Sequence, residues 1–146
     1  MRPKSIVRFE IFYLLSIAVG LISTAINWNT GLEKVQQSSP EAAAFYPAMV
    51  AGGAAISILI SLLLWYFTAR RASNVARWIL TVFFGLSILS LLYTLSTGQF
   101  PGGLAGIVAV TSYILNALAV VMLFQPDANA WFKRDTPPAQ DAETFE

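Results

Sequence analysis

Four long apolar segments, separated by shorter polar stretches, dominate the hydrophobic pattern of this chain. A helix needs about 20 predominantly apolar residues to cross the roughly 30 Å of hydrocarbon in a bilayer. We therefore predict four membrane spans, at about 9–27, 48–67, 78–95 and 103–124. Strands of a membrane barrel alternate in polarity over about ten residues, whereas the apolar runs here are continuous. Because lipid offers no hydrogen-bond partners to the backbone, each span must be an α-helix, and the predicted fold class is all-α.

The connections between the spans set the topology. Those at about 68–77 and 96–102 are so short that consecutive helices must be antiparallel neighbours. The chain is therefore predicted to form an up-down-up-down four-helix bundle within one transmembrane domain, 1–134. Ser39, Pro40 and Glu41 are typical of a helix start, so a short outer helix is expected at about 40–46.

The segment after the last span has two parts. Residues 126–133 combine Trp131 and Phe132 with Lys133, a mixture suited to a helix that lies in the inner headgroup layer. Residues 135–146 are acidic and poor in apolar residues, so we predict a disordered tail.

Charge placement predicts the orientation. Eight of the nine cationic residues lie before the first span, between the second and third, or after the fourth. These predicted inner-rim residues are Arg2, Lys4, Arg8, Arg70, Arg71, Arg77, Lys133 and Arg134. The positive-inside rule then places both termini in the cytoplasm, where the rim would attract anionic inner-leaflet lipids at about 1 kcal/mol per residue. Trp28 on the outer side, with Trp65, Trp78 and Trp131 on the inner side, are the predicted interfacial anchors.

An alternative for the first span is a cleavable signal peptide. Arg2, Lys4 and Arg8 resemble its charged start, and Ser23, Thr24 and Ala25 offer small residues for cleavage. The apolar run is longer than a typical signal core, which favours a retained span.

Composition restricts the chemistry. With 56% hydrophobic and 12% charged residues and a mean hydropathy of +0.63, the chain has too little polar surface for a soluble globule. It contains no Cys and no His, and its carboxylates do not cluster. We therefore expect no metal site, no cofactor and no enzymatic activity. A basic cluster this short, beside tryptophans, also makes nucleic acid a poor partner.

Small and hydroxylated residues recur at helical spacing in every span, and we assign these faces to helix packing in the bundle interior. The predicted packing residues are Ser16, Gly20, Ser23, Gly53, Ser57, Ser61, Ser87, Ser90, Ala105, Ala109, Ser112 and Asn116.

Asn116 is the most polar side chain near mid-membrane, with Tyr113 one turn before it. One interpretation is that Asn116 bonds Ser or Thr on a neighbouring helix; the other is that both residues line a small polar pocket for a lipid headgroup, a quinone-like molecule or a pigment. Glu10 is the only acid that could enter a span. We expect it to pair with a basic residue such as Arg70 or Arg77 rather than to relay protons.

Several short stretches carry a family resemblance. The chain resembles small four-span inner-membrane proteins of proteobacteria in Arg2-Pro3-Lys4-Ser5-Ile6, Phe9-Glu10 and Tyr13-Leu14-Leu15-Ser16 at the start, and in Phe124-Gln125-Pro126-Asp127 and Ala130-Trp131-Phe132 at the end. The resemblance implies the fold and the bacterial inner membrane, and it brings no activity with it.

Two functions follow from these observations. The leading hypothesis is a non-enzymatic accessory or structural subunit of a larger membrane complex, or a self-associating bundle. The alternative is a transporter of a small solute or lipid that acts as an oligomer, since one bundle filled with bulky side chains leaves little room for a path.

Overall fold

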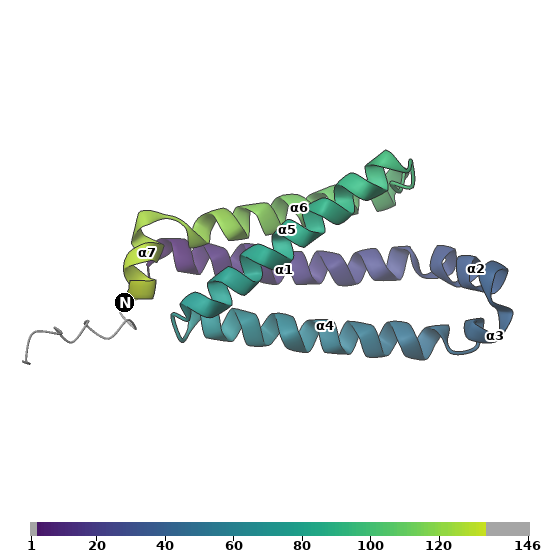
Figure 1. Cartoon of the computed structure of the whole chain (residues 1–146), viewed down its shortest axis with the longest axis horizontal. Helices are drawn as coiled ribbons and strands as arrows, with labels where there is room; N and C mark the ends of the chain where they lie inside the picture. The colour runs from purple at the N-terminus through teal and green to yellow at the C-terminus, as the bar shows by residue number, and fades with distance from the viewer. Residues whose placement is uncertain (1–2, 134–146) are drawn as a thin grey trace, which may run out of the picture.

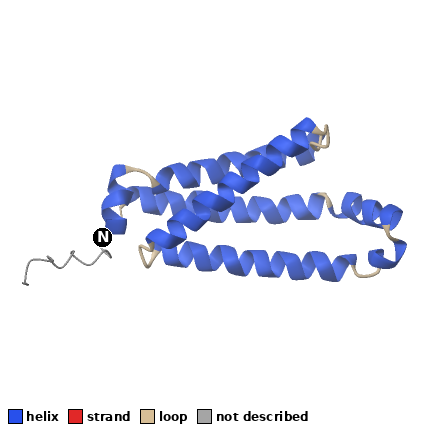
Figure 2. Ribbon diagram, in the orientation of Figure 1, coloured by secondary structure: helices blue, strands red, loops and turns tan. Residues whose placement is uncertain are grey.

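The computed structural model describes residues 3–133 as seven helices joined by short loops (Figures 1 and 2). Arg2, Arg134 and the predicted tail at 135–146 lie outside the described residues. The helices are α1 (Lys4–Ile26), α2 (Trp28–Ser38), α3 (Pro40–Ala43), α4 (Tyr46–Ala69), α5 (Asn74–Ser96), α6 (Gly103–Leu123) and α7 (Pro126–Lys133). No strand occurs within 3–133.

Four of these helices, α1, α4, α5 and α6, are long and apolar enough to cross a membrane. The prediction of an all-α, four-span fold is therefore confirmed. Successive long helices run in opposite directions, and contacts join α1 to α4, α4 to α5, α5 to α6 and α6 back to α1. The four helices thus enclose a central space, with α1 packed most extensively against α6.

The two ends of the bundle differ. The basic end holds the start of α1, the turn at 70–73 between α4 and α5, and α7 (Figure 1). The far end holds the α2–α3 segment and the loop between α5 and α6. From the basic end, α5 runs obliquely away from α4 and ends beside the start of α6.

A close-packed core lies at the basic end. Its largest fully buried side chains are Ile6 and Phe9 of α1, Thr68 of α4 and Leu123 of α6. The Phe9 ring also stacks on Tyr13, with 5.3 Å between ring centroids. Helices gain little by hiding apolar surface from equally apolar lipid, so this end is held by close packing and polar contacts.

The turn between α4 and α5 lies beside the core at the basic end, and its Ala72 belongs to that core. Ala72 adopts a left-handed conformation with φ of 50°, and the Ser73 N–H donates back to the Phe67 carbonyl at 3.0 Å. The Ser73 side chain then accepts from the Ala76 N–H at 3.3 Å, which caps the start of α5.

Helix α7 folds back onto the start of α1. Pro3 precedes α1 and offers no side-chain cap, but the Ser5 N–H donates to Asp127 Oδ2 of α7 at 3.2 Å. A carboxylate 122 residues away in sequence therefore satisfies a backbone donor that the first turn of α1 leaves open. This contact also brings the two ends of the described chain to the same end of the bundle.

The far end has more helix than the sequence predicted. The segment expected as an irregular outer connection forms α2, and α3 ends at Ala43 rather than near 46. Trp28 packs edge-to-face on Tyr46 with ring centroids 5.5 Å apart. Gly31 lies directly under that tyrosine, because a Cβ at this position would collide with the Tyr46 hydroxyl.

Candidate functional site

A cavity of about 450 Å³ lies between the four long helices, and each of them contributes to its lining. Along α1 the lining extends from Phe9 to Thr24, which is about 22 Å at 1.5 Å per residue. The cavity therefore occupies the middle of the membrane-spanning segments. Its volume falls within the range of small-molecule pockets, about 300–1,000 Å³.

The cavity is closed toward the basic end. Phe9, Tyr13, Leu80 and Ala119 line it there, and all four are buried members of the core. Lining residues farther along α1, such as Leu21, are exposed. The close-packed core thus forms a floor, and the opening lies on the side of the far end.

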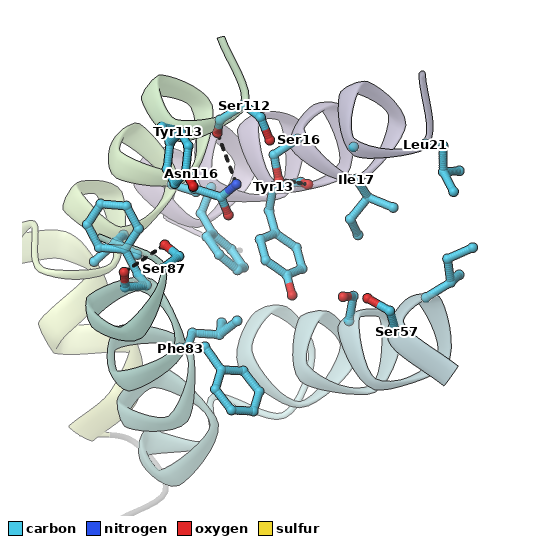
Figure 3. Close-up of a pocket in the computed structure, with 18 of the residues that line it drawn as sticks. Tyr13, Ser16, Ile17, Leu21, Ser57, Phe83, Ser87, Ser112, Tyr113 and Asn116 are labelled. Carbon is cyan, nitrogen blue, oxygen red and sulfur yellow. Dashed lines mark hydrogen bonds between the residues drawn. The ribbon is translucent and has the colours of Figure 1, made fainter. Parts of the chain in front are cut away.

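Polar groups from all four helices meet in this cavity (Figure 3). The Tyr13 ring of α1 points across it toward α4, with its hydroxyl near the Ser61 side chain. Ser16 donates to the Tyr13 carbonyl at 2.7 Å, and Ser87 donates to the Phe84 carbonyl at 2.7 Å. These two serine hydroxyls are therefore satisfied by the backbone of their own helix, whereas no partner is described for the hydroxyls of Ser57, Ser112 and Tyr113.

Asn116 and Tyr113 both line the cavity, one turn apart on α6. The Asn116 side-chain Nδ2 donates to the Ser112 carbonyl at 3.0 Å, within the same helix. The expected bond to Ser or Thr of a neighbouring helix is therefore absent among the described residues. The Asn116 amide oxygen points into the cavity, as Figure 3 shows.

The predicted packing residues divide into two groups. Those that line the cavity are Ser16, Gly20, Ser57, Ser61, Ser87, Ser112 and Asn116. Those outside its lining are Ser23, Gly53, Ser90, Ala105 and Ala109.

Two of the glycines depart from the packing prediction. A Cβ built on Gly20 or Gly53 meets no atom of another helix within 4 Å. Neither glycine therefore permits a close helix–helix approach in this structure. The reason at Gly20 is the cavity itself, which separates this face of α1 from α4 and α5.

The basic rim is also divided. Lys4, Arg8, Arg70, Arg71 and Lys133 are exposed at the basic end. Arg70 Nε lies 3.6 Å from Glu10 Oε1, which confirms that Glu10 pairs with a basic residue.

Arg77 does not belong to an exposed rim. Its side chain is only 8% exposed, and its guanidinium carbon lies 4.0 Å from the Phe124 ring centroid and 5.1 Å from that of Phe132. The guanidinium thus joins the start of α5 to the end of α6 and to α7. The prediction of an exposed cation failed here because α7 folds back over this position.

The predicted tryptophan anchors take different environments. Trp65 and Trp131 are partly buried against the core at the basic end. Trp78 is exposed on one side, where its ring packs edge-to-face on Phe124 with centroids 6.0 Å apart. Trp28 lies at the opposite, far end of the bundle, at the start of α2.

Sequence reasoning missed Tyr13 as a residue of the cavity lining. A signal was present, because Tyr13, Ser16 and Gly20 recur at spacings of three and four, which puts them on one helix face. No group of His, Cys, Asp and Glu that could hold a metal ion occurs within 3–133.

Comparisons with known proteins give no match. The chain matches no protein-family model, no curated protein and no solved structure. What this multi-pass membrane protein does must therefore be argued from its own helices and the cavity between them.

Proposed function

We propose that this chain is a non-enzymatic protein of the bacterial cytoplasmic membrane that holds a small lipid-like or lipophilic solute in its central cavity and acts as a carrier for it. The observation that supports this most directly is the cavity of about 450 Å³, to which all four long helices contribute. A bundle whose only task is structural gains from filling such a space, because empty volume in a core costs about 24 cal/mol per Å³.

In this proposal the basic end faces the cytoplasm. The exposed cations Lys4, Arg8, Arg70, Arg71 and Lys133 would then lie among the anionic headgroups of the inner leaflet. The cavity, which is closed at that end, would open toward the outer half of the bilayer. Movement of the solute to the inner half would require the core at the basic end to loosen.

Filling the cavity tests the proposal. In Gly20→Leu the new side chain starts into the cavity, since Gly20 lines it and nothing lies within 4 Å of a Cβ at this position. Gly85→Leu is the matched control, because Gly85 is equally unobstructed and lies outside the lining. Both variants gain the same helix propensity, about 1 kcal/mol relative to glycine.

The measurement is mass spectrometry of small molecules extracted from each protein after reconstitution in nanodiscs. We expect wild type and Gly85→Leu to retain the same molecule, and Gly20→Leu to lose it several-fold. Equal retention in all three proteins, or no enriched molecule in any, would overturn the proposal.

A second candidate function is self-association, or docking as an accessory subunit on a larger membrane complex. It is favoured by α4, whose apolar window has no buried residue, and by Gly53, where an added Cβ meets no atom. Small residues on an open face allow another helix to approach closely. Gly53→Leu should then lower the dimer fraction or release a co-purifying partner, whereas Ile56→Leu should not. Monodisperse monomer with nothing co-eluting in gentle detergent would contradict this function.

A further inference from the structure

We propose that the cavity selects an uncharged, ring-bearing molecule with a hydroxyl group, which donates a hydrogen bond to Asn116 Oδ1. This inference rests on the proposed function and names the class of ligand for the same cavity. Three features of the lining carry it: the absence of charge, the aromatic walls, and an amide oxygen that no described group satisfies.

The lining contains no Asp, Glu, Lys or Arg among the described residues. The carboxylate nearest in sequence, Glu10, is paired with Arg70 at the basic end. An ion without a counter-charge is expensive at mid-membrane depth, even by the lowest estimates of about 2.5–3.5 kcal/mol. A neutral ligand avoids that cost.

Aromatic side chains face the cavity from three helices. They are Phe9 and Tyr13 of α1, Phe83 and Phe84 of α5, and Tyr113 of α6. Aromatic pairs in offset or edge-to-face arrangements add about 0.5–1.5 kcal/mol beyond area burial. A ring in the ligand therefore uses this lining better than an acyl chain does.

The hydrogen bonds in the cavity leave several polar groups without a described partner, and Asn116 Oδ1 is the one among them that can only accept. Asn116 uses its Nδ2 on the Ser112 carbonyl, and no described donor reaches its Oδ1. The Tyr13 hydroxyl is turned toward Ser61 on the opposite side, and the Ser16 and Ser87 hydroxyls donate to backbone carbonyls. A ligand hydroxyl supplies the missing donor to Asn116, whereas a ligand that can only accept does not.

Three probes of similar size separate these features: para-hexylphenol, its methyl ether para-hexylanisole, and para-hexylbenzoate. The phenol carries the donor, the ether lacks it, and the benzoate carries a charge. Their dissociation constants are measured on the full chain in nanodiscs by saturation-transfer NMR, with binding to empty nanodiscs subtracted.

In the wild type we expect the phenol to bind about threefold to tenfold more tightly than the ether, the range for one net hydrogen bond. Asn116→Leu should bring that ratio close to one. Asn27→Leu is the matched control, since Asn27 makes the same kind of bond, to the Ser23 carbonyl at 2.8 Å, and lies outside the cavity. The benzoate should bind none of the three proteins above the level measured with empty nanodiscs.

The outcomes distinguish this inference from the proposed function. If the phenol and the ether bind equally to wild type, or if Asn116→Leu keeps their ratio, the proposed hydrogen bond to Asn116 is refuted. The carrier proposal still stands in that case if Gly20→Leu weakens the binding of both probes. If Gly20→Leu weakens neither, the cavity is not the binding site and both proposals fail. Tight binding of the benzoate overturns the selection for uncharged ligands. Should Asn116→Leu fail to fold, the wild-type ratio of phenol to ether decides alone.

Discussion

The stacking of Arg77 on two phenylalanine rings makes a quantitative prediction about the basic end. The guanidinium lies closer to Phe124 than to Phe132, at 4.0 Å against 5.1 Å, and is only 8% exposed. A cation–π contact is worth about 0.5–1 kcal/mol when exposed and about 2 kcal/mol when desolvated. We therefore expect a coupling free energy of about 1–2 kcal/mol between Arg77 and Phe124, and a smaller one between Arg77 and Phe132.

A double-mutant cycle with Arg77→Met and Phe124→Leu isolates this coupling. Phe124→Leu should be the more destabilising single change, because it leaves a buried guanidinium without its nearer ring and also removes the contact with Trp78. Arg77→Met should cost less, since it removes the desolvation penalty together with the attraction.

The free energies of unfolding are measured in mixed micelles by titration with a denaturing detergent, followed by far-UV circular dichroism. Arg71→Met with Phe124→Leu is the control cycle, because Arg71 is exposed and makes no described contact with a ring. That control should be additive. If the Arg77 cycle is also additive within about 0.3–0.5 kcal/mol, the aromatic stacking does not hold the basic end together and the reasoning is refuted.

Three further changes test other contacts. Hydrogen bonding to Ser5, whose N–H donates to Oδ2, lowers the pKa of Asp127, so the stability it contributes is present above the unfolded-state pKa, about 4, and is lost as pH falls; Asp127→Asn should flatten the acid limb of a plot of Tm against pH, and an unchanged limb would contradict this. Arg70→Ala should lower the free energy of unfolding by more than the roughly 0–1 kcal/mol of a fully exposed pair, because Glu10, 3.6 Å away, is only 13% exposed and loses this partner; a smaller loss in detergent unfolding would show that the pair behaves as a surface ion pair. Gly98→Ala should lower stability by about 1 kcal/mol in the same assay, because Gly98, in the loop just after α5, has a φ of 66°; no loss would mean that the loop relaxes around the new side chain.

The spans were predictable because the bilayer restricts the backbone so strongly. A continuous apolar run of sufficient length has only the helix available to it, and the short connections then allow only antiparallel neighbours. The faces that line the cavity also followed from helical spacing, as Ser16, Gly20, Ser112 and Asn116 illustrate.

The helical spacing of small residues could not distinguish a bundle with a filled interior from one with a central cavity. Small residues such as Gly20 suit both a close helix crossing and the wall of a cavity, and the choice depends on the tilt of α5 relative to α4. The burial of Arg77 was equally invisible in the sequence. It depends on α7 turning back over the start of α5, a tertiary contact that no local pattern encodes.

The pairing of α1 with α6, and of Ser5 with Asp127, has a consequence for biosynthesis. The ribosome delivers the first span long before its principal neighbour, so α1 must wait in lipid while α4 and α5 are inserted. Helix α7, which is synthesised after α6, then supplies the Asp127 carboxylate that accepts from the first turn of α1. A nascent chain arrested before residue 126 would expose an unfinished N-terminal turn to quality-control proteases.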